Sequence, residues 1–175
     1  MHDSVAMTRV TTEPLAWETI YQEHGRALLA YLTRLTHDRG SAEDLLQDTF
    51  VKAMAAAADL RDESALRSWL YRIATNSALR HLRRGRVLQW LPFTAAETQV
   101  DPAFDHSAMQ VHQALRSISR EQAATLLLHY QQGFSRREIA AIAGISEEGV
   151  KSRLARGRVN FMAAYRRLER GPEHE

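Results

Sequence analysis

Apolar residues recur every three or four positions along most of this 175-residue chain, which is the spacing of an amphipathic α-helix. No segment alternates apolar and polar residues as a half-buried strand does, and no Asn-Gly or Asp-Gly dipeptide marks a tight hairpin. The pattern therefore predicts an all-α fold. We expect helices near residues 14–36, 41–58, 65–84, 108–117, 120–131, 135–143 and 147–168.

The segment between the third and fourth expected helices departs from this periodicity. It contains Gly85, Pro92 and Pro102, its apolar residues cluster from Val87 to Phe93, and it then becomes acidic. A structureless stretch of roughly 20 residues is unusual inside one compact domain. We therefore expect two small helical domains joined by a flexible linker, with boundaries at 14–86, 87–107 and 108–170.

Composition excludes several classes of protein. The chain has no cysteine, which excludes disulfides, a thiolate metal site and a cysteine nucleophile, and suits a reducing cytoplasm. No run of about 18 apolar residues exists and the first 13 residues do not resemble a secretion signal, so we expect a cytoplasmic protein without membrane insertion. The histidines are scattered, and the close pair His106 and His112 lacks helical ligand spacing. We therefore expect no cofactor and no enzyme activity, a metal enzyme being the weaker reading.

The C-terminal half has the pattern of a helix-turn-helix. Ser135 and Glu138 form a capping box, Gly144 can take the left-handed conformation that ends a helix, and Ser146 can cap the next helix. Two short helices joined by such a turn set the second helix into a DNA major groove. The residues expected to face DNA there are Arg136, Arg137, Glu148, Gly149, Lys151, Ser152, Arg153 and Arg156.

Charge supports this interpretation without deciding it. Residues 136–170 contain nine Lys or Arg and four Glu, and a basic block of this kind suits phosphates or guanine edges. The alternative is an ordinary helical hairpin whose basic face is only solvated. A stand-alone transcription regulator, binding duplex DNA without polymerase, also remains open.

The N-terminal half pairs an acidic helix with a basic one. Ser41 and Asp44 form a second capping-box pattern, and the helix they start exposes an acidic side that a lone solvated helix would also have. The next helix places an aromatic beside regularly spaced cationic and polar residues, which suits stacking and phosphate contacts on single-stranded DNA. Alternatively, Trp69 fills the edge of the core and the arginines are solvated. The residues on that face are Trp69, Arg72, Asn76, Arg80 and Arg83.

Four sequence motifs resemble a known family. The stretches Ala42–Phe50 (AEDLLQDTF) and Leu66–Asn76 (LRSWLYRIATN) closely resemble sigma region two. Gly144–Ser146 (GIS) and Val150–Leu154 (VKSRL) resemble sigma region four. The two blocks stand in the family's order, with no room for the intermediate domain of housekeeping sigma factors. The layout is similar to that of an extracytoplasmic-function (ECF) sigma factor.

The resemblance implies roles for these motifs. It implies a protein that binds core RNA polymerase (β′ coiled coil and β subunit), directs it to promoters in a stress or envelope response, and is commonly held inactive by an anti-sigma factor. The residues it assigns to the β′ coiled coil are Asp44, Gln47, Asp48 and Phe50. A loop and the helix after it would read and open the minus-ten element, with loop residues Asp59, Leu60, Arg61, Asp62 and Ser64.

Helix 147–158 would read the minus-thirty-five element. Two features depart from the family pattern. Ile118-Ser119 replace a frequent Leu-Pro, and Gly149 stands where Thr or a similar residue is usual, which puts the minus-thirty-five preference in doubt. The apolar cluster Trp90–Phe93 is assigned equally to an anti-sigma contact or to packing between the domains.

Overall fold

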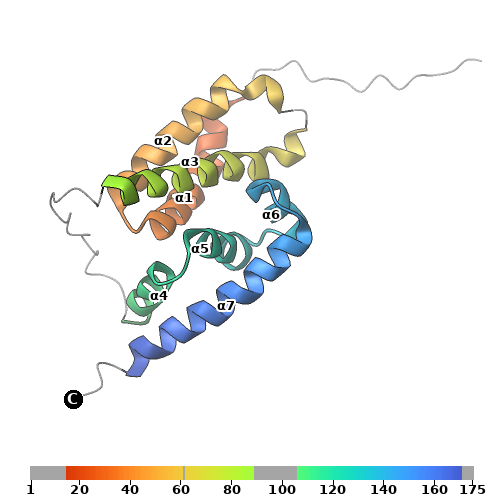
Figure 1. The fold of residues 1–175 in the computed structure, drawn as a ribbon. Helices are drawn as coiled ribbons and strands as arrows, with labels where there is room; N and C mark the ends of the chain where they lie inside the picture. The colour runs from red at the N-terminus through yellow and green to blue at the C-terminus, as the bar shows by residue number, and fades with distance from the viewer. Residues whose placement is uncertain (1–14, 61, 89–105, 171–175) are drawn as a thin grey trace, which may run out of the picture.

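The computed structural model describes residues 15–60, 62–88 and 106–170, and every regular element in these ranges is helical (Figure 1). The predicted all-α fold is therefore confirmed. Between the helices lie two short 3₁₀ turns, Ala57–Asp59 and Glu63–Ala65, and a π-helical segment, Leu127–Gln131. The α-helices are α1 (Trp17–Thr36), α2 (Arg39–Ala55), α3 (Leu66–Leu88), α4 (His106–Arg116), α5 (Arg120–Leu126), α6 (Arg136–Ala143) and α7 (Glu147–Arg170).

The N-terminal unit, formed by α1, α2 and α3, differs from expectation where α2 begins. His37 has a φ of +61° and ends α1 in the left-handed region, and Asp38 then caps α2 by accepting a 2.7 Å hydrogen bond from the Ser41 amide. The predicted capping box of Ser41 and Asp44 is wrong, because the Asp38 carboxylate already accepts the hydrogen bond of the Ser41 amide. The bond also holds the pKa of Asp38 below its usual range.

The C-terminal unit consists of α4, α5, the π-helical segment, α6 and α7. Helix α7 crosses the unit and packs against α4, α5 and α6. Gly157 is buried at the crossing with α5, where a Cβ atom would lie 3.4 Å from Gln122 Cβ and from Leu126 Cγ. The absence of a side chain there lets the two helices approach closely.

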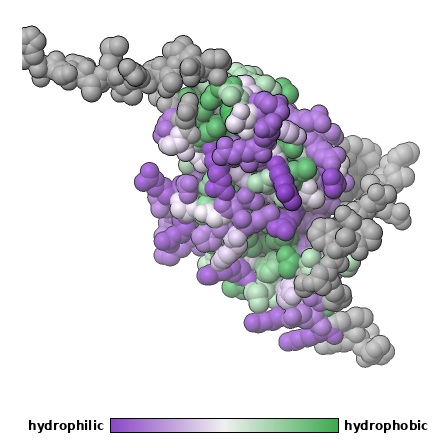
Figure 2. Space-filling view, turned by 180° about the vertical axis from the view of Figure 1, so that it is seen from behind, coloured by the Kyte–Doolittle hydropathy of each residue, from purple (hydrophilic) through white to green (hydrophobic). Residues whose placement is uncertain are grey.

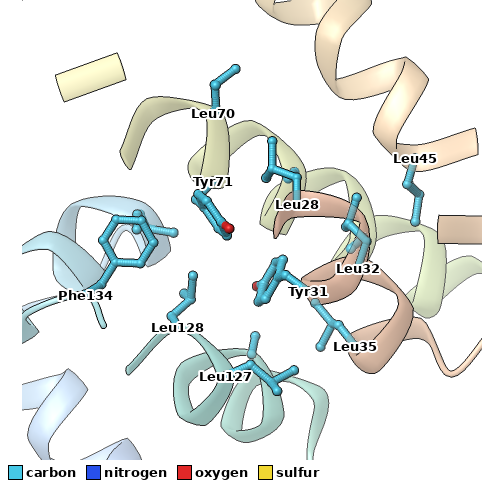
Figure 3. Close-up of a cluster of buried hydrophobic side chains, with 14 of the residues drawn as sticks. Leu28, Tyr31, Leu32, Leu35, Leu45, Leu70, Tyr71, Leu127, Leu128 and Phe134 are labelled. Atoms are coloured by element: carbon cyan, nitrogen blue, oxygen red, sulfur yellow. The ribbon is translucent and has the colours of Figure 1, made fainter. Parts of the chain in front are cut away.

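The two units share one hydrophobic core. Figure 3 shows Leu28, Tyr31 and Tyr71 of the N-terminal unit beside Leu128 and Phe134 of the C-terminal unit. Each of these side chains is at most 1% exposed. The units therefore bury apolar surface against each other as well as within themselves. The predicted linker, with its cluster Trp90–Phe93, lies outside the described residues except at its ends, and the boundaries 14–86 and 108–170 stay a prediction.

Candidate DNA-binding and polymerase-binding surfaces

The predicted turn between α6 and α7 is present with its caps. The Ser135 hydroxyl accepts a hydrogen bond from the Glu138 amide at 3.3 Å, and the Glu138 carboxylate accepts one from the Ser135 amide at 2.8 Å. These bonds hold the pKa of Glu138 below its usual range. Gly144 has a φ of +66°, and the Ser146 hydroxyl accepts from the Gly149 amide at 3.1 Å. The caps thus fix the angle at which α7 leaves the turn.

Helix α7 has one buried face and one polar face. Val150, Leu154 and Gly157 are buried. Gly149 and Arg153 are half-buried, and a Cβ atom on Gly149 would lie only 3.2 Å from the Ser146 hydroxyl that caps the helix. The remaining residues predicted to face DNA are all exposed, namely Arg136, Arg137, Glu148, Lys151, Ser152 and Arg156.

The basic face of α3 is only partly as predicted. Arg72, Asn76, Arg80 and Arg83 are exposed along one side of the helix. Trp69 is not: its side chain is 8% exposed and belongs to the hydrophobic core. The prediction of an exposed aromatic at Trp69 is therefore wrong for this arrangement, and the alternative left open by the sequence, a core-edge residue, describes it.

The loop before α3 is held by local hydrogen bonds. The Asp62 carboxylate accepts from the Ser64 amide at 2.9 Å and from the Ser64 hydroxyl at 2.6 Å, which lowers the pKa of Asp62. Asp59, Asp62 and Ser64 are exposed and Leu60 is half-buried, whereas Arg61 lies outside the described residues. The loop therefore presents carboxylates and a hydroxyl toward solvent, close to the start of the basic helix.

The outer face of α2 combines carboxylates with apolar side chains. Asp44 and Gln47 are exposed, and the half-buried Asp48 forms an ion pair with Lys52, whose ammonium also donates to the Ser77 hydroxyl at 2.9 Å. Phe50 is 6% exposed, so its side chain lies in the core and not on the outer face of α2. Its assignment to the polymerase-binding residues stays a prediction.

Phe50 packs instead against the ring of Tyr21, with 5.0 Å between centroids. Sequence reasoning missed three exposed apolar residues on α1 and α2: Tyr21 (47% exposed), Val51 (61%) and Met54 (46%). Their signal was available, because Val51 and Met54 fall on the helical face of Gln47 and Asp48 rather than on that of Leu46 and Phe50. Together with Asp44, Gln47 and Asp48 they form what we call the α2 surface.

Comparison with known protein families identifies both halves of the chain. The model for Sigma-70 region 2 matches residues 20–87, and the model for Sigma-70, region 4 matches residues 108–160. The chain is 34% identical to the ECF RNA polymerase sigma factor SigM of Mycobacterium tuberculosis over 155 residues, which cover 87% of this chain and 78% of that protein. The chain belongs to the sigma-70 family, in its ECF group. It is a sigma factor, as the resemblance implied.

Other relatives of this sigma factor agree. RNA polymerase sigma factor YlaC of Bacillus subtilis is 31% identical over 153 residues, covering 82% of this chain and 88% of that protein. Among solved structures, the sigma factor RpoE in complex with the anti-sigma factor NepR, from Bartonella quintana, superposes with a TM-score of 0.70 at 28% identity and covers 85% of this chain and 98% of that one. CnrH, in complex with the cytosolic domain of CnrY, superposes with a TM-score of 0.64 at 25% identity and covers 84% of this chain and 85% of that one.

A groove crosses from one unit of the sigma factor to the other. It has a volume of about 460 Å³ and is lined by apolar residues of α4, α5, the π-helical segment and α7, together with Arg34 of α1 and Arg158 of α7. Tyr130 and Met162 line it while remaining 61% and 43% exposed. Figure 2 shows hydrophobic side chains gathered low on the back face among hydrophilic ones. The buried Gln131 Oε1 at this groove has no hydrogen-bond partner.

The described part of the chain contains neither a cluster of metal-binding side chains nor a helix that could span a membrane. Within residues 15–60, 62–88 and 106–170, no three His, Cys, Asp or Glu side chains come together in a way that could hold a metal ion. None of the helices described in those ranges is both long and apolar enough to cross a membrane.

Proposed function

We propose that this sigma factor binds core RNA polymerase, directs it to specific promoters and promotes opening of the DNA there. Sigma factors are transcription regulators, and in this proposal the chemical reaction belongs to the polymerase. The observation that carries the proposal is the presence of two separate basic surfaces, on α3 and on α7, beside a third surface on α2 that is acidic and apolar. Each surface suits a different partner.

The α2 surface suits a protein partner. Exposed apolar side chains at its centre can be desolvated on binding, while carboxylates at its rim choose a partner of complementary charge. Val51 and Met54 are the exposed apolar side chains of this surface, and Asp44 and Asp48 carry its carboxylates. We assign this surface to the β′ coiled coil of the polymerase, the role that the family resemblance gives to this helix.

The α3 face and the loop before it suit the minus-ten element. Regularly spaced arginines can neutralise phosphates of a separated strand, and an unstacked base needs a pocket lined by polar groups. Arg72, Asn76, Arg80 and Arg83 are placed to neutralise the phosphates. The exposed loop residues Asp59, Asp62 and Ser64 offer polar groups for the base. Stacking by Trp69 would require the indole to leave the core, so we assign it no contact in the free protein.

Helix α7 suits the minus-thirty-five element. Its exposed face carries the Glu148 carboxylate, the Lys151 ammonium, the Ser152 hydroxyl and the Arg156 guanidinium, which are groups that read base edges in the major groove. Glu148 and Lys151 form a 3.3 Å ion pair on that face, so either side chain must exchange its partner when a base is read. The exposed Arg136 and Arg137 at the start of α6 suit phosphates.

The groove between the units suits an inhibitory protein. Its only charged lining residues are Arg34 and Arg158, and the rest of the lining is chiefly apolar. An amphipathic helix bearing acidic residues matches both features. We propose that an anti-sigma factor places such a helix here, in the cytoplasm or at the inner face of the membrane.

Binding to core polymerase by gel filtration tests the α2 assignment. The double variant Val51→Ala/Asp48→Asn should weaken complex formation at least tenfold, since it removes an apolar contact and a carboxylate from the surface. The control Val159→Ala/Glu121→Gln likewise changes a valine and neutralises a carboxylate, but on the C-terminal unit, and should bind like the wild type. Wild-type affinity of the first variant would refute the assignment to α2.

A further inference from the structure

A single carboxylate stands on the side of α7 that we assign to DNA. Residues 136–170 contain four Glu, and three of them lie elsewhere. The Glu138 carboxylate closes the capping box of α6. Glu147 lies about 100° round α7 from Glu148, toward the buried side of the helix, and Glu169 lies in the last turn. Glu148 therefore brings a negative charge to a face whose other groups are cationic or neutral.

The carboxylate of Glu148 is placed to reach a ligand in front of α7. Counted along the helix, Glu148 lies about 160° round from the buried Val150, almost opposite the side that packs on the domain. Its side chain is 77% exposed. Ser152, one turn later on the same side, is short and exposed, which leaves the carboxylate room to extend outward.

A negative charge at this place opposes DNA binding unless a partner on the DNA compensates for it. B-form DNA carries about one negative charge per 1.7 Å of its axis, so it repels the Glu148 carboxylate. In the free protein the Lys151 ammonium, 3.3 Å away, balances that charge. Both side chains are exposed, and an exposed ion pair is weak. The pair can therefore open when both groups find partners on the DNA.

Base edges in the major groove offer a carboxylate few donors. The cytosine N4 and adenine N6 amino groups donate, whereas guanine and thymine present only acceptors there. Adenine carries the N7 acceptor beside its amino group, and this acceptor repels a carboxylate, so cytosine is the better partner. The guanine paired with that cytosine presents O6 and N7, which suit the ammonium of Lys151 once Glu148 has released it.

We infer that Glu148 is a specificity-determining residue, which selects a cytosine in the minus-thirty-five element by accepting a hydrogen bond from its N4 amino group. This role rests on the proposed function, since α7 must lie in the major groove of that element. The same carboxylate rejects guanine and thymine at that position, because it would face their acceptors. Arg156 lies eight residues further along the helix, or about 12 Å, so the two side chains address different base pairs.

Selection among promoter variants tests this role with the full chain bound to core polymerase. A genomic fragment that the complex transcribes is randomised through its minus-thirty-five element, and the bound sequences are counted. Glu148→Ala removes the carboxylate, and Glu148→Gln replaces it with an amide, which pairs with adenine through N6 and N7. The control Glu147→Gln makes the same change one residue earlier, also at an exposed position.

We expect the wild type and the control to prefer cytosine at one position by about tenfold, the discrimination typical of a specific base contact. Glu148→Ala should abolish this preference, Glu148→Gln should change it to adenine, and preferences at other positions should stay as they are. An unchanged preference in either variant, or a different base preferred by the wild type at the position that Glu148 controls, would overturn the role.

Two further outcomes are informative. A gain in affinity of Glu148→Ala for every sequence alike, with no change in base preference, would also overturn the role, because it would show that the carboxylate only repels DNA. A wild-type complex with no base preference anywhere in the element would instead overturn the proposed function of α7, and the specific role of Glu148 with it.

Discussion

Tyr31 of α1 and Thr75 of α3 share a hydrogen bond of 2.9 Å inside the core, where both side chains are at most 2% exposed. Burial is the main reason that the pKa of the Tyr31 phenol is raised. The bond links the first helix to the basic helix, so it helps to hold the α3 face at a fixed angle to α1 and α2. Neither partner is water-accessible, which makes the pair sensitive to the loss of one member.

The first prediction concerns this pair. Thr75→Val leaves the Tyr31 hydroxyl buried without a partner and should lower the free energy of unfolding by about 1–3 kcal/mol. The double variant Tyr31→Phe/Thr75→Val removes both groups and should cost less than the sum of the two single changes. Urea unfolding followed by circular dichroism measures all four proteins. Strict additivity of the two losses would show that the bond is not formed.

The second prediction separates core from surface on α2. Phe50→Ala should lower the free energy of unfolding by about 3–5 kcal/mol, because the ring is buried against Tyr21. Val51 is exposed, so Val51→Ala should lower the free energy of unfolding by less than about 0.5 kcal/mol. The same change should nevertheless weaken polymerase binding. Thermal unfolding and gel filtration with core polymerase distinguish the two effects. A large loss of stability in Val51→Ala, with normal binding, would reverse the assignment.

Sequence periodicity predicted the seven helices well because each helix buries one apolar stripe. The capping box at Ser135 and the turn at Gly144 were predictable because both depend on local chemistry. Trp69 could not be placed for the opposite reason: an aromatic side chain at a helix edge turns inward or outward according to its tertiary neighbours. The contacts of Arg67 and Tyr71 with Gln132 and Phe134 have no sequence signal, since the first two residues lie more than 60 positions before the other two.

The third prediction concerns pH. Burial first, then the charge of His112 and the nearby Arg116 and Arg120, lower the pKa of His37 to about 3. In the unfolded chain this pKa is about 6.5, so the fold is stabilised relative to the unfolded chain as long as His37 is neutral in both. The contribution of His37 to the free energy of unfolding is complete above about pH 6.5 and is lost as the pH falls toward 3.

A substitution of His37 isolates this effect. Between about pH 7.5 and pH 5, wild-type stability should fall more steeply than that of His37→Asn, whose new residue tolerates the left-handed backbone conformation. Urea midpoints across that range provide the comparison. Parallel curves for the two proteins would mean that His37 does not titrate as the structure requires.

The fourth prediction concerns the cap of α6. Ser135→Ala removes the acceptor for the Glu138 amide and should cost about 1 kcal/mol of stability. Ser117→Ala provides a control, because Ser117 is also exposed at a helix end but bonds only to a carbonyl of its own helix. Thermal unfolding of both variants measures the difference. Equal losses would show that the capping box contributes no special stability.

The fifth prediction concerns the DNA-facing side of α7. If Arg156 contacts a phosphate, Arg156→Ala should reduce the slope of log affinity against log salt concentration by about 1. If it reads a base instead, specificity at one position of the site should relax while the slope stays nearly unchanged. Arg166→Ala, ten residues further along α7 and also exposed, should change neither quantity. Titration of a promoter duplex with the reconstituted polymerase complex at several salt concentrations separates these cases.

Run-off transcription with core RNA polymerase on genomic DNA fragments tests the proposed function most directly. Core enzyme alone should give no discrete transcripts, and addition of this chain should give transcripts that start at defined positions. The free chain should bind the same fragments weakly. Tight duplex binding by the free chain, with no discrete transcripts when core enzyme is present, would contradict the account and favour a stand-alone regulator.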